Sequence, residues 1–155
     1  MLTLIAVGRD RNDPLVVAAQ EYVQRIRRWI PTSVIEVREE PLRRTRNPEE
    51  VRRAEGQRIL QKVPAGHRVI ALEPGGRGLS SEAWAEHLWS WVFERKRGLV
   101  FVVGGPVGLS MEVLQRSDET RSLGPMTLPH RLARLIVAEQ LYRAMTILHD
   151  EPYHK

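Results

Sequence analysis

Apolar runs alternate along the chain with segments of helical periodicity. Residues 2–7 form an apolar run with a β-branched centre, followed by Gly8, which predicts a buried strand. Further strands are predicted at residues 33–37, 67–72 and 99–103. The last is a continuous β-branched and aromatic run, typical of a strand buried on both faces of a parallel sheet.

Helices are predicted between these strands. Asp13 and Pro14 are typical of a cap and a first helical position, and Pro31 ends the helix that they open. The remaining helices are predicted at residues 48–63, from Ser81 to about Arg97, at 110–116 and at 129–149, with a mobile basic loop at 40–46 and a tail at 151–155. The alternation predicts an α/β fold with a mostly parallel sheet and flanking helices, forming a single domain over residues 1–155.

Composition excludes several kinds of site. Hydrophobic residues make up 42% and charged residues 28%, the balance of a soluble globular protein, and cysteine is absent. Disulfides, thiolate nucleophiles and cysteine-ligated zinc are therefore excluded, and the five histidines show no metal-ligand spacing. The N-terminus lacks the features of a signal peptide, and the longest uncharged stretch falls short of the ~20 apolar residues of a membrane span. We expect a cytoplasmic protein without membrane or metal.

The charge favours a polyanionic partner. Lysine and arginine total 24 against 19 acids, the formal net charge is +5, and 21 of the 24 cations are arginine. Arginine binds phosphate through a planar fork and stacks on bases, so nucleic acid is the favoured partner. A compositional bias towards arginine on solvated faces is the alternative.

Two predicted strands end in glycine-rich loops, Leu-Glu-Pro-Gly-Gly at residues 72–76 and Gly-Gly-Pro-Val-Gly at 104–108. Ligands of parallel sheets bind beyond the carboxyl ends of the strands, and glycine lets the main chain approach them closely. This arrangement suits a nucleoside-bearing cofactor, although tight strand-to-helix turns would look the same. The dinucleotide-binding, P-loop and nucleophile-elbow motifs are all absent.

The last predicted helix carries polar groups on an otherwise apolar segment. Arg131 and Arg134 share one face, and Glu139 lies four residues before Arg143, the spacing of an ion pair. Apolar residues lie on several sides of the helix, which predicts either a central core helix or one half of a dimer interface.

Four motifs together resemble a known family. They are Leu-Pro-His at 128–130, Ala-Glu-Gln-Leu-Tyr-Arg-Ala at 138–144, Pro-Tyr-His at 152–154 and Gly-Gly-Pro-Val-Gly-Leu at 104–109. The chain resembles the bacterial large-subunit rRNA pseudouridine N3-methyltransferases, small members of the SPOUT class of S-adenosylmethionine-dependent enzymes. The resemblance covers essentially the whole chain.

The resemblance implies a C-terminal trefoil knot, a homodimer, and a cofactor bound in the knot near the dimer interface. The implied substrate is a pseudouridine of large-subunit ribosomal RNA, recognised in the assembled ribosome. The implied cofactor contacts are Leu72, Gly104, Gly105, Leu123, Gly124, Pro125, Met126, Thr127 and Leu128.

The reaction needs a positioned methyl donor and a group that stabilises the imide anion of the base. The catalytic candidates are Arg143, with Arg131 as a second charge stabiliser, and Tyr153 and His154 closing over the site. His154 is a candidate proton acceptor, with solvent as the alternative. Glu139 is expected to orient Arg143.

The sequence alone leaves other functions open. A non-catalytic RNA- or ribosome-binding protein would use the arginine surface without binding S-adenosylmethionine. A SPOUT methyltransferase acting on another RNA, such as tRNA, would share the glycine loops. A nicotinamide-dependent enzyme is disfavoured because the dinucleotide fingerprint is missing.

Overall fold

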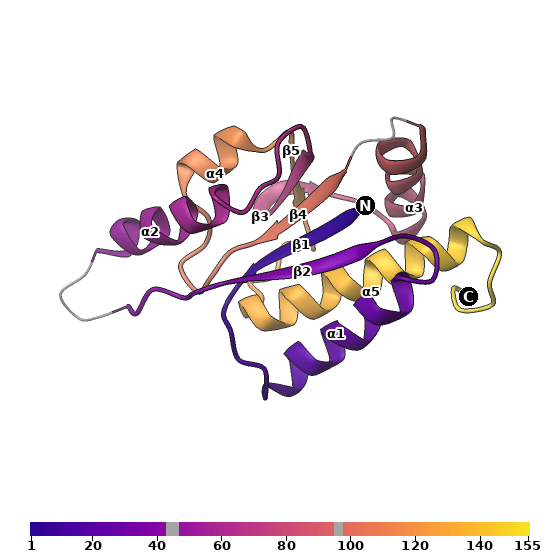
Figure 1. The fold of residues 1–155 in the computed structure, drawn as a ribbon, viewed down its shortest axis with the longest axis horizontal. Helices are drawn as coiled ribbons and strands as arrows, with labels where there is room; N and C mark the ends of the chain where they lie inside the picture. The colour runs from indigo at the N-terminus through magenta and orange to yellow at the C-terminus, as the bar shows by residue number, and fades with distance from the viewer. Residues whose placement is uncertain (43–46, 95–97) are drawn as a thin grey trace.

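The computed structural model describes residues 1–42, 47–94 and 98–155, and its strands form one five-stranded sheet (Figure 1). The strand order is β2-β1-β4-β3-β5, and every neighbouring pair is parallel. The strands are β1 (Leu2–Val7), β2 (Thr32–Val37), β3 (Arg68–Gly78), β4 (Leu99–Val103) and β5 (Glu119–Ser122). The predicted α/β class and parallel sheet are confirmed, whereas the trefoil knot and the single domain stay predictions.

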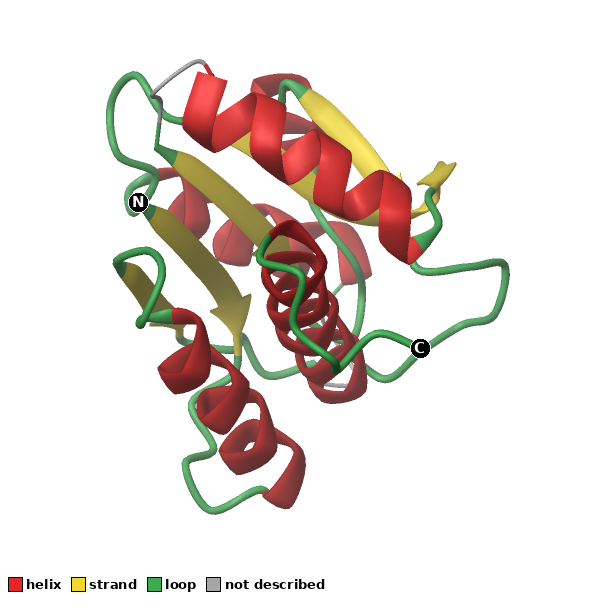
Figure 2. Ribbon diagram, turned by 90° about the vertical axis from the view of Figure 1, so that its right-hand side faces the viewer, coloured by secondary structure: helices red, strands yellow, loops and turns green. Residues whose placement is uncertain are grey.

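Helices cover both faces of the sheet (Figures 1 and 2). The helices α1 (Pro14–Ile26), α3 (Ser81–Leu88) and α5 (His130–Leu148) pack on one face, and α2 (Pro48–Leu60) and α4 (Met111–Arg116) pack on the other. Within the described residues, no helix combines the length and apolar character needed to cross a membrane.

The central strands divide their side chains between two cores. Leu4 and Phe101 point to the α1–α3–α5 side, whereas Ile5 and Val102 belong to the α2–α4 side. This follows from the two-residue period of a strand. All five residues of β4 are buried, as the continuous apolar run predicts for a strand covered on both faces.

The sequence reading was wrong about the third strand. Residues 74–76, predicted as a loop, lie within β3, which continues to pair with β5 through Arg77 and Arg121 after an irregularity that follows Leu72. A Cβ on Gly76 would lie 2.7 Å from the carbonyl carbon of Arg121, so glycine here allows the close approach of the strands. The sequence did not predict β5, because its residues Glu-Thr-Arg-Ser are polar and carry no strand pattern.

Two helices differ from their predicted extents. The second ends at Leu60 rather than at residue 63, and the third changes after Leu88 into a π-helical segment, η1 (Trp89–Glu94). The predicted end of that helix near residue 97 and most of the predicted basic loop, residues 43–46, lie outside the described residues.

Candidate functional site

A cavity of about 170 Å³ lies beyond the carboxyl end of β4 and beside the irregularity that follows Leu72 in β3, next to the loops where the sequence predicts a ligand. Every predicted cofactor residue lines it except Pro125, which is exposed on the loop between Gly124 and Met126. The lining consists of Leu72, Glu73, Pro74, Val103, Gly104, Gly105, Pro106, Gly108, Leu109, Ser122, Leu123, Gly124, Met126, Thr127, Leu128, His130 and Ala133. The three predicted segments therefore meet at one place.

The turn after β4 needs glycine for steric reasons. A Cβ on Gly105 would lie 2.7 Å from Oε2 of Glu55 and 3.0 Å from Cγ1 of Val7. The turn is closed by the N–H of Gly108, which donates to the carbonyl of Gly105 at 3.0 Å. With no room for a side chain, main-chain atoms form this wall of the cavity.

The segment after β5 is held by a side chain that sequence reasoning missed. The hydroxyl of Ser122 donates to the carbonyl of Gly124 at 2.9 Å and accepts from its N–H at 3.1 Å. Gly124 has a φ of +124°, a conformation that favours glycine. Beyond it Met126 is 73% exposed at the mouth of the cavity.

Glu55 is a buried carboxyl group behind the glycine turn, and its sequence context did not mark it as a site residue. It is 1% exposed; Oε1 accepts from the N–H of Glu40 at 2.9 Å, and Oε2 has no hydrogen-bond partner among the described residues. Burial raises the pKa of Glu55, and the nearby Glu39 carboxylate adds to the rise, against the opposing effect of the Glu40 hydrogen bond. Folding therefore favours the protonated acid.

We expect Glu55→Gln to gain stability relative to the parent protein as the pH rises. A carboxyl whose pKa is raised on folding contributes most below its unfolded pKa, near 4.5, and loses that contribution as the pH rises through the folded pKa. The glutamine side chain of the variant cannot ionise, so the difference in free energy of unfolding should grow from about pH 4 to about pH 8. Urea unfolding across this range measures it, with exposed Glu50→Gln on the same helix as control. A pH-independent difference would contradict the prediction.

Gly105→Ala should weaken binding of a ligand in the cavity. The added Cβ would collide with Glu55 and Val7, so the turn must move by several tenths of an ångström. We expect affinity for the cofactor that the sequence predicts, S-adenosylmethionine, to fall about tenfold or more, since main-chain donors and acceptors lose their alignment. Calorimetry measures this, and Gly75→Ala, where a Cβ meets nothing within 4 Å, is the matched control. Equal affinities for the two variants would refute the role of the turn.

His130 begins α5 at the edge of the cavity. Its Nε2 is buried without a hydrogen-bond partner in the described part of the chain and lies 3.9 Å from Oε2 of Glu39. Burial lowers the pKa of His130, and the Glu39 carboxylate only partly opposes this. The ring is therefore kept neutral beside the predicted cofactor loops.

A second cluster gathers the three predicted catalytic residues at the other end of α5. Oε1 of Glu139 accepts from Nε of Arg143 at 3.0 Å and from its Nη2 at 2.6 Å, which confirms the predicted ion pair. The hydroxyl of Tyr153 donates to the same oxygen at 3.1 Å. Arg143 turns Nη1 towards Nδ1 of His154, at 3.4 Å, and its guanidinium lies over the ring of Tyr153, 4.8 Å from the centroid.

The protonation of this cluster follows from its contacts. The hydrogen bond to Glu139 raises the pKa of Arg143, so the guanidinium stays charged. Burial, followed by hydrogen bonds with Tyr22 and Glu139, raises the pKa of Tyr153, which therefore remains a phenol and a donor. Nε2 of His154 donates to Glu82 at 2.9 Å, which leaves Nδ1 as the acceptor. The cluster presents a fixed cation beside an imidazole.

Arg131 does not join this cluster. Its guanidinium pairs with Asp13 at 3.1 Å and with Asp10 at 3.6 Å, at the start of α1. Arg131 follows His130 at the cavity end of α5, and its role as a second charge stabiliser stays a prediction.

The cavity and the cluster lie apart within one chain. Arg143 follows His130 by thirteen positions along α5, which corresponds to about 20 Å at the rise of an α-helix. Among the described residues, no three His, Asp or Glu side chains gather as metal ligands would.

Comparisons with known proteins give matches that extend over essentially the whole chain. A family model described as "Predicted SPOUT methyltransferase" matches residues 1–154. The chain is 45% identical over 154 residues to a ribosomal RNA large subunit methyltransferase H of Anaeromyxobacter sp. (strain Fw109-5), with 99% of each chain covered. It is 43% identical over 153 residues to a protein of the same name from Syntrophotalea carbinolica, covering 99% of this chain and 97% of that one.

One solved structure shows the same fold. It is that of a probable methylase family protein from Haemophilus influenzae Rd KW20, with a TM-score of 0.54 and 14% identity. The alignment covers 96% of this chain and 66% of that one, and at this identity the likeness concerns the fold alone.

Proposed function

Because this chain belongs to the SPOUT methyltransferase family, we propose that it transfers a methyl group from S-adenosylmethionine to N3 of a pseudouridine in large-subunit ribosomal RNA. The observation that carries this proposal is the meeting of three segments, residues 72–74, 103–109 and 122–128, around one cavity with a main-chain wall. The full-length similarity to ribosomal RNA large subunit methyltransferases H supports the choice of RNA.

The residues of the cavity fit this donor. Leu72, Leu109 and Leu128 give apolar surface for a nucleobase, and the main chain at Gly104 and Gly105 gives hydrogen-bonding groups for its edge. Glu73 is the one carboxylate of the lining, and its negative charge attracts a cation such as a sulfonium. When bound, S-adenosylmethionine supplies an activated methyl group on a sulfonium centre.

The C-terminal cluster is suited to the acceptor base. N3 of pseudouridine is an imide nitrogen between two carbonyl groups, and losing its proton leaves an anion spread over both oxygens. Arg143 offers a charged N–H donor to such an oxygen, and Glu139 fixes its orientation. His154 is the proposed proton acceptor through Nδ1, which faces Nη1 of Arg143 at 3.4 Å.

Two copies of the chain are needed to bring cluster and cavity together in this proposal. One chain holds them about 20 Å apart along α5, so the cluster of a second copy would complete the site. Leu132, Leu135 and Ile136 remain partly exposed on α5, which supports a homodimer formed through this helix. The excess of arginine supports a ribosomal partner, and we place the enzyme in the cytoplasm with the ribosome.

Calorimetry and single-turnover methylation test the activity. We expect S-adenosylmethionine to bind and N3-methylpseudouridine to form in large-subunit RNA of ribosomes lacking this modification, as mass spectrometry of digested RNA would show. Methylation of tRNA instead would favour the alternative that this SPOUT methyltransferase acts on an RNA other than ribosomal RNA. An absence of cofactor binding would refute the enzymatic proposal.

Mixing two inactive variants tests the shared site. Gly105→Val damages the cavity and Arg143→Ala damages the cluster, so each homodimer should be inactive. Random exchange should give heterodimers in which one of two sites is intact, and about a quarter of the parental activity should return. No recovery, with dimer exchange verified by mass spectrometry, would refute the shared site.

A further inference from the structure

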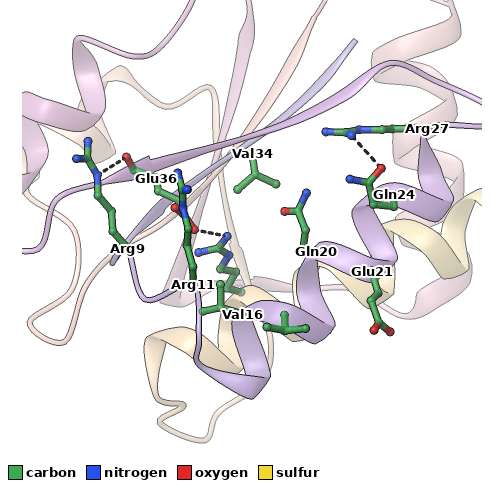
Figure 3. A pocket seen from close by; sticks show the side chains of 11 residues that line it. Arg9, Arg11, Val16, Gln20, Glu21, Gln24, Arg27, Val34 and Glu36 are labelled. Atoms are coloured by element: carbon green, nitrogen blue, oxygen red, sulfur yellow. Dashed lines mark hydrogen bonds and ion pairs between the residues drawn. The ribbon is translucent and has the colours of Figure 1, made fainter.

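A groove of about 810 Å³ runs along the free edge of the sheet, between β2 and α1. Figure 3 shows Arg9, Arg11 and Glu36 at one end and Arg27 with Gln24 at the other, with Val34 and Gln20 between them. Four arginines and two glutamates line it, so cations are in excess. No part of the proposed catalytic site uses this groove.

The edge of β2 is covered by guanidinium groups. Nε of Arg27 donates to the carbonyl of Thr32 at 2.9 Å, and Nε of Arg9 donates to that of Glu36 at 3.3 Å. Charged side chains on an edge strand oppose the addition of a strand from another protein. Arg27 also donates from Nη1 to Oε1 of Gln24 at 2.9 Å. Nη2 of Arg27 and the terminal nitrogens of Arg9 therefore remain for a further partner, spaced along about 13 Å of strand.

Two further arginines strengthen the case for an anion. Arg11 is exposed and makes no hydrogen bond or ion pair with the described residues, so its whole guanidinium is available. The side chain of Arg134 is 3% exposed at the groove wall; one Nη donates to Glu36 at 2.9 Å, whereas Nε has no partner in the described chain. Arg134 therefore adds a positive charge to the wall of the groove, where it attracts an anion.

The groove adjoins the cavity across the first turns of α5. Ala133 lines the cavity, and the next residue, Arg134, lines the groove. A chain lying in the groove would pass within about one helix diameter, 10–12 Å, of the cavity.

We propose that the β2–α1 groove binds the sugar–phosphate backbone of the RNA substrate. The arginines contact phosphates, and Val34 and the amide of Gln20 contact the sugars between them. This inference rests on the proposed function for the identity of the RNA, but it concerns a surface separate from the methyl-transfer site.

Binding to purified assembled ribosomes at several salt concentrations tests the groove. We expect Arg9→Gln combined with Arg11→Gln to weaken binding about tenfold at 0.1 M salt and to reduce the slope of log K against log salt by about 2, since each phosphate contact contributes about 0.9. Affinity for S-adenosylmethionine should not change. Arg53→Gln combined with Arg116→Gln removes the same charge from the α2–α4 face and should leave binding at the parental level. Equal effects of the two pairs would overturn the proposal.

Crosslinking identifies the occupant directly. The chain has no cysteine, so Val17→Cys in the groove and Met111→Cys on the opposite face, both exposed apolar positions, accept a photoactivatable thiol reagent at one site each. We expect ribosomal RNA crosslinked through residue 17 and not through residue 111. Crosslinks from residue 17 to a ribosomal protein or to a second copy, or RNA crosslinks from both positions, would overturn the proposal. RNA crosslinks at residue 17 without methylation would uphold the groove and refute the proposed reaction.

Discussion

Replacing Arg143 by alanine should lower the single-turnover rate of methyl transfer about 10²–10³-fold, the usual cost of losing one preorganised charged donor. Glu139 holds two nitrogens of this guanidinium, so the cation is already oriented before substrate binds. Because the proposed partner of Arg143 is the acceptor base and not the cofactor, affinity for S-adenosylmethionine should stay at the parental value. The change should therefore appear in kcat rather than in cofactor binding.

One further variant separates the charge of Arg143 from the orientation of its guanidinium, and another serves as control. Arg143→Lys keeps the positive charge but loses the planar fork that reaches Glu139 and His154 together, so it should recover only part of the rate. Arg28→Ala is the control, because Arg28 pairs with Glu151 of the same tail yet lies outside the cluster. Rapid-quench methylation of ribosomes measures all three. A parental rate for Arg143→Ala would remove the cluster from the mechanism.

Local signals predicted much of this molecule. The continuous apolar run of residues 99–103 predicts the strand β4, and such a run also predicts that the strand is buried on both faces. The cap of α1 is equally local, since the carboxylate of Asp13 accepts from the N–H of Leu15 at 2.8 Å. The glycines at 104–105 also lie in the cavity wall, as expected for a glycine-rich loop beyond the carboxyl end of a parallel strand.

The features that sequence reasoning missed depend on contacts distant along the chain. Glu55 looks like one more acid on a polar helix, and only packing against the turn at Gly105 reveals a buried carboxyl group. The strand β5 exists because it pairs with residues 70–72 of β3 and again with residues 77–78 after the irregularity. The β2–α1 groove likewise joins residues 9, 27 and 134, which no spacing rule relates.

Removing the carboxylate of Glu36 should destabilise the fold by about 3–5 kcal/mol, the cost of leaving one member of a buried ion pair uncompensated. Its partner Arg134 has a side chain only 3% exposed, so water cannot replace the lost acceptor. We expect Glu36→Leu to show this loss in urea unfolding at a fixed protein concentration. Glu151→Gln, which breaks the more exposed pair with Arg28, should cost less than about 1 kcal/mol.

The double variant Glu36→Leu with Arg134→Met decides the cause of that loss. If the uncompensated guanidinium is responsible, removing it as well should restore most of the stability, because apolar side chains of similar volume can replace a buried pair at little cost. A double variant as unstable as the sum of the two single variants would show that packing, not charge, governs this site. A restored double variant would still lack the groove's buried cation, so its binding to ribosomes should be weaker than that of the parent at equal stability.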